Sequence, residues 1–190
     1  MKSFTKALIV IAVLAALVYF VAIPYLHTET KKFSPTKSAT LAFGDGKIEV
    51  DYSSPSKKGR VIFGELVPYG EVWRTGANEP TTFSTSKDIK IIDKTLPSGT
   101  YSLWTIPNKA SWKVIFNTEI PDWGVTRVNG NKTTHEALYD YLVVDVPVTP
   151  LEMPVEDFSI WFENEEDGRF TQEYLSLAWD TEKISVPISK

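Results

Sequence analysis

Apolar residues recur at every second position through most of the chain from Thr40 onward. The alternation is clear in Lys47–Tyr52, in Ser111–Asn117 and in Phe158–Glu163. A period of two is that of a β-strand with one face against a core and the other toward solvent, whereas a surface α-helix has a period of 3.6 residues. The pattern therefore predicts an all-β fold.

Turn residues separate the apolar runs. Residues 44–46 (Gly-Asp-Gly) lie between Leu41–Phe43 and Lys47–Tyr52, which is typical of a β-hairpin. Further strands are expected over Tyr101–Ile106, Tyr174–Trp179 and Ile184–Ile188. Roughly nine or ten short strands at this spacing indicate an antiparallel β-sandwich, jelly-roll-like in its arrangement.

A long apolar run precedes these strands. Residues Ala7–Ile23 are an unbroken run of 17 apolar residues, and about 17–20 such residues are enough to cross a bilayer as a helix. A cleaved signal peptide is the alternative, but its apolar part is shorter and ends at a small-x-small site, which is absent after Ala22. We therefore predict an uncleaved signal-anchor.

The predicted organisation has three parts. Residues 1–27 form the N-terminal membrane anchor, residues 28–38 a polar tether, and residues 39–190 the β-sandwich domain. Lysines flank the apolar run on both sides, so the positive-inside rule does not fix the orientation. Because the segment otherwise looks like an export signal, we expect the domain on the extracytoplasmic, periplasmic side.

Composition excludes several classes of function. The net charge is −4, with 24 acidic and 20 basic residues, whereas a nucleic-acid-binding protein needs a basic excess. There is no cysteine and there are only two histidines, His27 and His135, so neither a thiolate site nor a His-rich zinc site is expected. No cofactor motif is present. The acidic run Glu163–Asp167 lacks calcium-loop spacing and predicts a solvated hairpin tip.

The most polar segment without strand alternation is Gly64–Pro80. Loops of such content often carry binding groups. An arginine beside a tryptophan offers a planar fork of donors next to an aromatic face, which suits carboxylates, sugars or phosphates. The alternative is structural, with Arg74 and Glu79 as an internal ion pair and Asn78 capping a turn. The candidate ligand-binding residues are Arg60, Tyr69, Trp73, Arg74, Asn78 and Glu79.

The same region resembles the bacterial domain-of-unknown-function family numbered 2911. The most specific match is the run Val72–Glu79 (Val-Trp-Arg-Thr-Gly-Ala-Asn-Glu), and the resemblance covers most of residues 48–188. Further matching segments are residues 52–60, 62–64, 66–70, 96–103, 106–107, Trp112 and 122–124. The family has no established activity, and the resemblance implies a secreted or envelope protein.

Two positions depart from the family pattern. Ser54 stands where the resemblance implies arginine, and Val125-Thr126-Arg127 stands where aromatic residues often follow the Trp-Gly pair. A family site that uses these positions would be altered in this chain.

The leading hypothesis is a membrane-tethered β-sandwich that binds an envelope glycan or a small anionic ligand. One rival is a structural or assembly role in the cell envelope, with protein partners of unknown identity. Another is a hydrolase that uses Glu65 and Glu79 as its carboxylate pair.

Overall fold

The computed structural model describes residues 2–126, 132–168 and 170–190. The chain forms two compact units, residues 1–33 and residues 34–190. The first unit is helical and consists of α1 (Lys2–Leu17), the π-helical η1 (Val18–Ala22) and α2 (Ile23–Lys31). The described residues of the second unit form nine strands and a short 3-10 helix, and they include the candidate residues.

The helix of the first unit is long and apolar enough to cross a membrane. The candidate span is Phe4–Lys31, which has 28 residues, and its described apolar side chains are exposed. The π-helical turn lies just before Pro24, and Ile23 donates its backbone N–H to the carbonyl of Val18. Proline has no N–H to donate and crowds the carbonyl four residues earlier, which is a common cause of such irregular turns.

The segment expected to be a polar tether is mostly regular. Helix α2 continues to Lys31 and β1 (Thr36–Phe43) begins five residues later, so only residues 32–35 of the segment lie outside a helix or strand. The difference arises because the polar residues of α2 continue a helix that the apolar run has already nucleated, and propagating a helix costs far less than starting one. The division into anchor, tether and domain stays a prediction.

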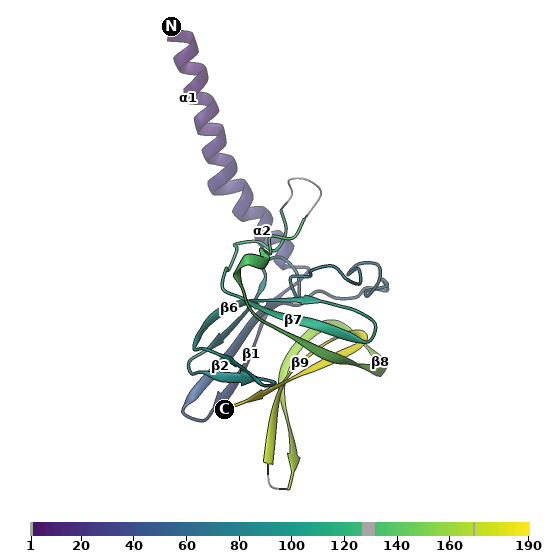
Figure 1. Ribbon diagram of the computed structural model, residues 1–190. Helices are drawn as coiled ribbons and strands as arrows, with labels where there is room; N and C mark the ends of the chain where they lie inside the picture. The colour runs from purple at the N-terminus through teal and green to yellow at the C-terminus, as the bar shows by residue number, and fades with distance from the viewer. Residues whose placement is uncertain (1, 127–131, 169) are drawn as a thin grey trace. The chain divides into compact units, whose positions relative to one another are not determined.

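The second unit is built on one antiparallel sheet (Figure 1). Its strands follow the order β1-β2-β3-β6-β7-β8-β9-β4-β5. The strands after β1 are β2 (Gly46–Ser53), β3 (Thr81–Thr85), β4 (Ile89–Ile91), β5 (Lys94–Leu96), β6 (Gly99–Ile106), β7 (Ser111–Asn117), β8 (Asp140–Asp167) and β9 (Phe170–Ser189), with the 3-10 helix η2 (Ala137–Tyr139) before β8. The predicted all-β class is confirmed, and so is the first hairpin, in which Phe43 pairs with Gly46.

Strands β8 and β9 are much longer than the short strands that the sequence predicts. β8 has 28 residues and β9 has 20. The first part of β8 pairs with β7 up to Pro147, and the part from Val148 onward pairs with β9. The pairing with β9 shifts register between Pro150 and Ser159. Prolines are tolerated at such irregular positions, so they interrupt the alternation without ending the strand.

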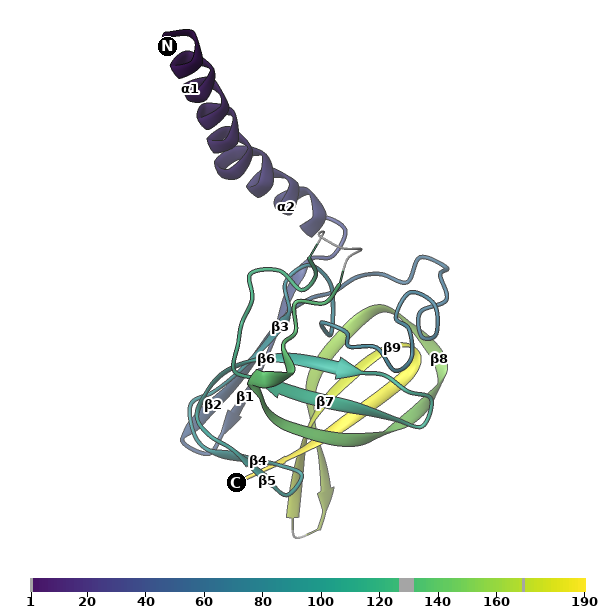
Figure 2. The same cartoon turned by 45° about the horizontal axis from the view of Figure 1, so that its top comes forward.

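The bend in β8 brings the two portions of the sheet around one core (Figure 2). Tyr52 on β2 packs edge-on against Phe158 on β8, with ring centroids 5.7 Å apart, and the Ser54 hydroxyl donates to the Phe158 carbonyl over 2.7 Å. Among the described residues, 27 hydrophobic side chains are buried in this core, and such burial is the main stabilising term in a domain of this kind. The sheet is open at β1 and β5, and its shape is compatible with the predicted sandwich.

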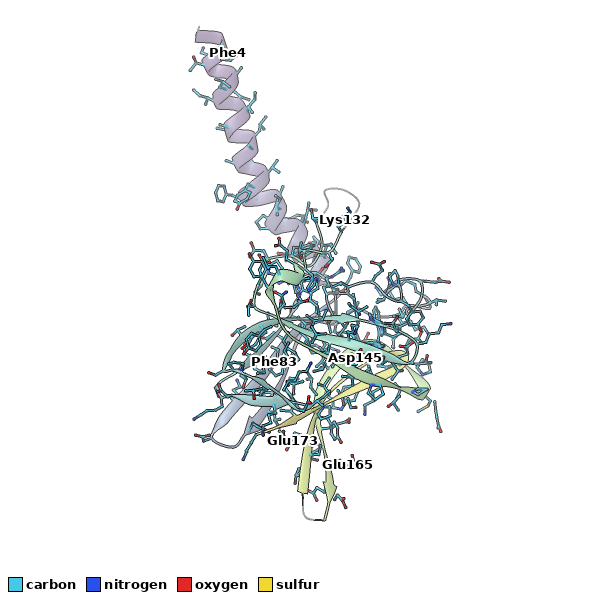
Figure 3. The ribbon with its side chains drawn as sticks, in the orientation of Figure 1. Phe4, Phe83, Lys132, Asp145, Glu165 and Glu173 are labelled. Carbon is cyan, nitrogen blue, oxygen red and sulfur yellow. The ribbon has the colours of Figure 1, made fainter. Side chains whose placement is uncertain are left out.

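The β8–β9 hairpin projects from the rest of the second unit, and Figure 3 labels Glu165 and Glu173 on it. Glu165 pairs with Gln172 and Asp167 with Phe170, so the acidic run does form a hairpin tip as predicted. Glu163, at the base of this tip, is held by Lys183, whose ammonium lies 2.7 Å from its carboxylate.

Candidate functional site

The Gly64–Pro80 segment contains no helix or ladder strand, but backbone hydrogen bonds fix it to the sheet. The Trp73 N–H donates to the Thr105 carbonyl over 2.7 Å, and the Thr105 N–H donates to the Trp73 carbonyl over 2.9 Å. The Gly70 N–H donates to the Pro107 carbonyl over 2.9 Å. The segment is therefore a rigid loop held against the end of β6.

Trp73 belongs to the core. Only 8% of its surface is exposed. Its ring stacks on Trp179 at 5.9 Å with an interplanar angle of 17°, and it packs against Phe158 at 5.0 Å. Its indole N–H donates to the Gly76 carbonyl over 3.0 Å. Trp112 on β7 packs edge-on against the same ring at 6.1 Å, so neighbours from both sheet portions surround it and it does not present a free face for stacking a sugar.

The residues after Arg74 make a buried turn. Thr75, Gly76 and Asn78 all have positive φ, at 55°, 145° and 60°. A side chain on Gly76 would come within 2.7 Å of the Ser53 carbonyl, so glycine is required there. Asn78 is 7% exposed and its amide reaches the Ser53 hydroxyl only at 3.5 Å. The conspicuous Thr-Gly-Ala-Asn run is therefore explained by backbone geometry.

Arg74 is the one candidate residue that combines burial, charge and an adjacent cavity. Its Nε is buried and has no hydrogen-bond partner among the described residues. Burial lowers the pKa of the guanidinium. Within the described residues, Arg74 forms no ion pair with Glu79 or with any other acidic side chain, so its positive charge is not compensated.

Gly124 gives the Arg74 side chain its place. A Cβ atom on Gly124 would lie 2.8 Å from the Cβ of Arg74 and 2.2 Å from its Cδ. The Gly124 N–H donates to the Asn78 carbonyl over 2.9 Å, which holds the two loops together at this point. The glycine of the Trp-Gly pair in the sequence therefore allows the two loops to approach each other closely.

A cavity of about 580 Å³ lies between the same two loops. Arg74, Glu71 and Lys132 supply its charged residues, and most of the remaining lining is apolar. Figure 3 labels Lys132, at the end of the second unit opposite the β8–β9 hairpin. Within the described parts of the chain, neither Glu71 nor Lys132 forms an ion pair. A volume of this size is in the range of small-molecule sites.

The other predicted residues do not line this cavity. Arg60 is exposed, and its guanidinium donates to the carbonyls of Lys57 and Ser56 in its own loop over 2.9 and 2.5 Å. Glu79 is half-buried, and Glu65 is exposed on the surface.

Tyr69 takes part in a separate polar cluster. Its hydroxyl donates to one carboxylate oxygen of Glu182 over 2.5 Å, and the Trp112 indole N–H donates to the other over 3.0 Å. Desolvation, followed by the nearby Glu182 and Asp180 carboxylates, raises the pKa of Tyr69 to about 12. The phenol therefore remains a hydrogen-bond donor over the physiological pH range.

Sequence reasoning missed several cavity residues, among them Leu66, Glu71, Val125 and Lys132. Glu71 and Lys132 belong to no sequence motif that would mark them as binding residues. Val125 is one of the departures from the family pattern, which was a usable signal, whereas Arg127 lies outside the described residues. Ser54, the other departure, is buried and bonded to the Phe158 carbonyl, away from the cavity lining.

No group of three or more His, Asp or Glu side chains within residues 2–126, 132–168 and 170–190 is arranged to hold a metal ion. His135 instead lies 2.7 Å from Asp140, and its ring packs beside Trp104 at 5.4 Å. The geometry therefore directs attention to the Arg74 cavity.

Comparisons with known proteins give a single result. The model of a family described as "Protein of unknown function (DUF2911)" matches residues 34–188. The search of curated proteins and the search of solved structures gave no match. The matched range begins before β1 and ends one residue before the end of β9, so it includes the described residues of both loops of the Arg74 cavity. The chain therefore belongs to the DUF2911 family.

Proposed function

We propose that the domain binds a small anionic ligand in the Arg74 cavity. The observation that carries the proposal is the uncompensated guanidinium: Arg74 has a buried Nε without a hydrogen-bond partner and lines a cavity of about 580 Å³. A buried charge without a partner is costly, so proteins normally pair such groups. An anion at the terminal amino groups of Arg74 would supply that pair.

The geometry favours an anion over a neutral glycan. Trp73, the expected sugar-stacking residue, is only 8% exposed and packs against the rings of Trp112, Phe158 and Trp179. Binding of an anion needs only the planar fork of an arginine, which accepts a carboxylate or phosphate in a bidentate geometry. Of the six residues proposed from the sequence, Arg74 and Trp73 line the cavity.

The proposal can be tested with the full chain in lipid nanodiscs. Acetate, phosphate and sulfate are titrated by calorimetry, and thermal unfolding is followed at saturating anion. A ligand present at 100 times its dissociation constant adds about 2.7 kcal/mol to the free energy of unfolding. For a domain of this size the melting temperature rises by roughly 2–4 °C per kcal/mol.

The matched control is Arg74→Met, which keeps an unbranched apolar stem and removes the guanidinium with its charge. Because no ion pair is broken, this variant should be as stable as the wild type or slightly more stable. It should also lose the response to anions. If the variant responds to the anions as the wild type does, the Arg74 cavity is not their site. If it is destabilised by about 3–5 kcal/mol, Arg74 is half of a structural pair.

We further propose that the Phe4–Lys31 helix is retained as a signal-anchor and that the β-domain lies on the extracytoplasmic side. The length and hydropathy of the helix support the anchor, and the export-like N-terminus supports the orientation. Protease added to spheroplasts should degrade the β-domain without lysis. A domain that becomes sensitive only after lysis would contradict the orientation.

A further inference from the structure

We infer that the ligand of the Arg74 cavity is a monocarboxylate that carries a hydrocarbon tail. This inference rests on the proposed function and adds the chemical class of the ligand. It is drawn from the walls of the cavity, from the distribution of charge around it, and from the part of the Arg74 guanidinium that a ligand can reach.

The walls of the cavity are mostly apolar. Leu66, Val67, Pro68, Val72 and Val125 line it together with Trp73. Leu66 is 45% exposed, whereas Val67 beside it is 3% exposed. The wall therefore runs from a buried floor to an apolar rim in contact with water. An inorganic anion would leave this surface wet, whereas a hydrocarbon chain would cover it.

The charges of the cavity favour a single negative group. Arg74 and Lys132 provide two cations, but the third charged residue is the acidic Glu71. No ion pair joins Glu71 to either cation within the described residues. Its carboxylate would attract a cation or repel a second anion. A ligand with one carboxylate and an uncharged tail fits this arrangement better than a dicarboxylate or a phosphate dianion does.

The accessible part of Arg74 is the end of the guanidinium. Nε is the side-chain nitrogen that is both buried and unpartnered, so the terminal amino groups are left to meet a ligand. Gly124 packs against the Cβ, Cγ and Cδ atoms of Arg74 and leaves no room for the side chain to retract there. Two parallel hydrogen bonds from the terminal amino groups to one carboxylate would fix the head and leave the tail to follow the wall.

The test uses the full chain in lipid nanodiscs and a series of linear carboxylates. Acetate, butanoate, hexanoate and octanoate are titrated into the wild type and into Arg74→Met, which corrects for partition into the bilayer. The Arg74-dependent association constant should rise about two- to fourfold with each methylene that is buried. Sulfate serves as the anion without a tail.

The outcomes distinguish the proposed binding of an anion at Arg74 from the inferred hydrocarbon tail of that anion. If acetate and sulfate bind through Arg74 but the longer carboxylates bind no better, the hydrocarbon tail is wrong and anion binding stands. If no anion binds in an Arg74-dependent way, both are wrong. Nanodiscs preloaded with oleate distinguish the source of the ligand: competition with added hexanoate assigns a membrane fatty acid, and undiminished hexanoate binding assigns a soluble carboxylate.

A pair of surface variants tests where the tail lies. Leu66→Ser removes the apolar rim, and Ile120→Ser removes an isoleucine of similar exposure, 44%, that does not line the cavity. The increase in association constant from acetate to octanoate should be smaller in Leu66→Ser than in the wild type and unchanged in Ile120→Ser. An equal effect of the two substitutions would overturn the assignment of the tail to this wall.

Glu71→Gln tests the selection for a single charge. The wild type should bind hexanoate more tightly than hexanedioate, and Glu71→Gln should narrow that difference. A preference that is the same in both proteins would refute the role of Glu71.

Discussion

Replacing Gly124 by alanine puts a methyl group where the Arg74 side chain lies. The new Cβ would be 2.2 Å from Cδ, 3.1 Å from Cγ and 2.8 Å from Cβ of Arg74. The Cδ and Cγ contacts can be relieved by a change of rotamer. The Cβ contact cannot, because that atom moves only with the backbone, so the two loops must separate by about 0.6 Å to reach an ordinary contact of 3.4 Å.

The expected cost of Gly124→Ala is about 1–3 kcal/mol, which is typical of overpacking in a site that cannot expand freely. For a domain of this size the melting temperature should fall by roughly 2–12 °C. The matched control is Gly46→Ala, whose new Cβ would meet two side chains closely, the Cγ of Lys87 at 2.7 Å and the Oγ of Ser86 at 3.0 Å, and would meet no backbone atom closer than 3.4 Å. The Lys87 side chain is 54% exposed and can move away, so this variant should cost much less.

A double-mutant cycle isolates the contact. In an Arg74→Gly background Gly124→Ala should cost almost nothing, and in an Arg74→Ala background it should cost an intermediate amount, since only the Cβ contact remains. Urea unfolding of the full chain in nanodiscs measures each free energy of unfolding. If the cost of Gly124→Ala is the same in all three backgrounds, the two residues are not coupled and our account of the cavity wall fails.

Three further predictions concern residues away from that contact. Burial raises the pKa of Glu163, but hydrogen bonds from Lys183, Ser176 and Trp161 outweigh the effect of burial and lower the pKa to about 2. The contribution of the ionised Glu163 to the free energy of unfolding is therefore complete above the unfolded pKa near 4.5 and is lost as the pH falls through about 2. Glu163→Gln should cost at most about 1 kcal/mol at pH 7, given the screening of a partly exposed network, and clearly less at pH 2, where about half of the Glu163 carboxyl is protonated. Urea unfolding at both pH values checks this, and a cost independent of pH contradicts it. The pKa of Tyr69 near 12 should return toward 10 in Glu182→Gln, read from tyrosinate absorbance against a Tyr69→Phe reference, and an unchanged titration would exclude Glu182 as a cause. Trp73→Ala should cost about 3–5 kcal/mol because its ring packs in the core; a cost below about 1 kcal/mol would return Trp73 to the list of surface binding residues.

The sequence predicts those elements whose signal is local. The hairpin around residues 44–46 and the strand Ser111–Asn117 were found because alternation and turn chemistry report on neighbours a few residues away. The continuity of β8 was missed because Pro150 interrupts the pattern, although the register shift at that point accommodates it. Strand length depends on the partner strand, which the local pattern does not contain.

In the candidate site, too, the sequence predicts features that are local to one segment and misses those that depend on distant residues. Residue types identified Trp73 and Arg74 as unusual, but whether a tryptophan faces solvent depends on Phe158 and Trp179, which are distant in the chain. The cavity lies between residues of the segment 66–74 and the residues Gly124, Val125, Lys132 and Thr133, and nothing local to either part of the chain predicts that they meet. Gly124 was visible only as part of the Trp-Gly pair of the family resemblance.

The length of β8 has a consequence for how the domain folds. One strand supplies the ladder partner of β7 with its first residues and the ladder partner of β9 with the remainder. If β8 detaches from β7 or from β9, backbone N–H and C=O groups of that neighbouring strand lose their hydrogen-bond partners, because both strands pair with the same β8. We therefore expect the two portions to exchange their amide hydrogens through one common opening reaction instead of as separate cooperative units. The exception is the projecting tip beyond Glu163, which has no third strand beside it and can fray alone.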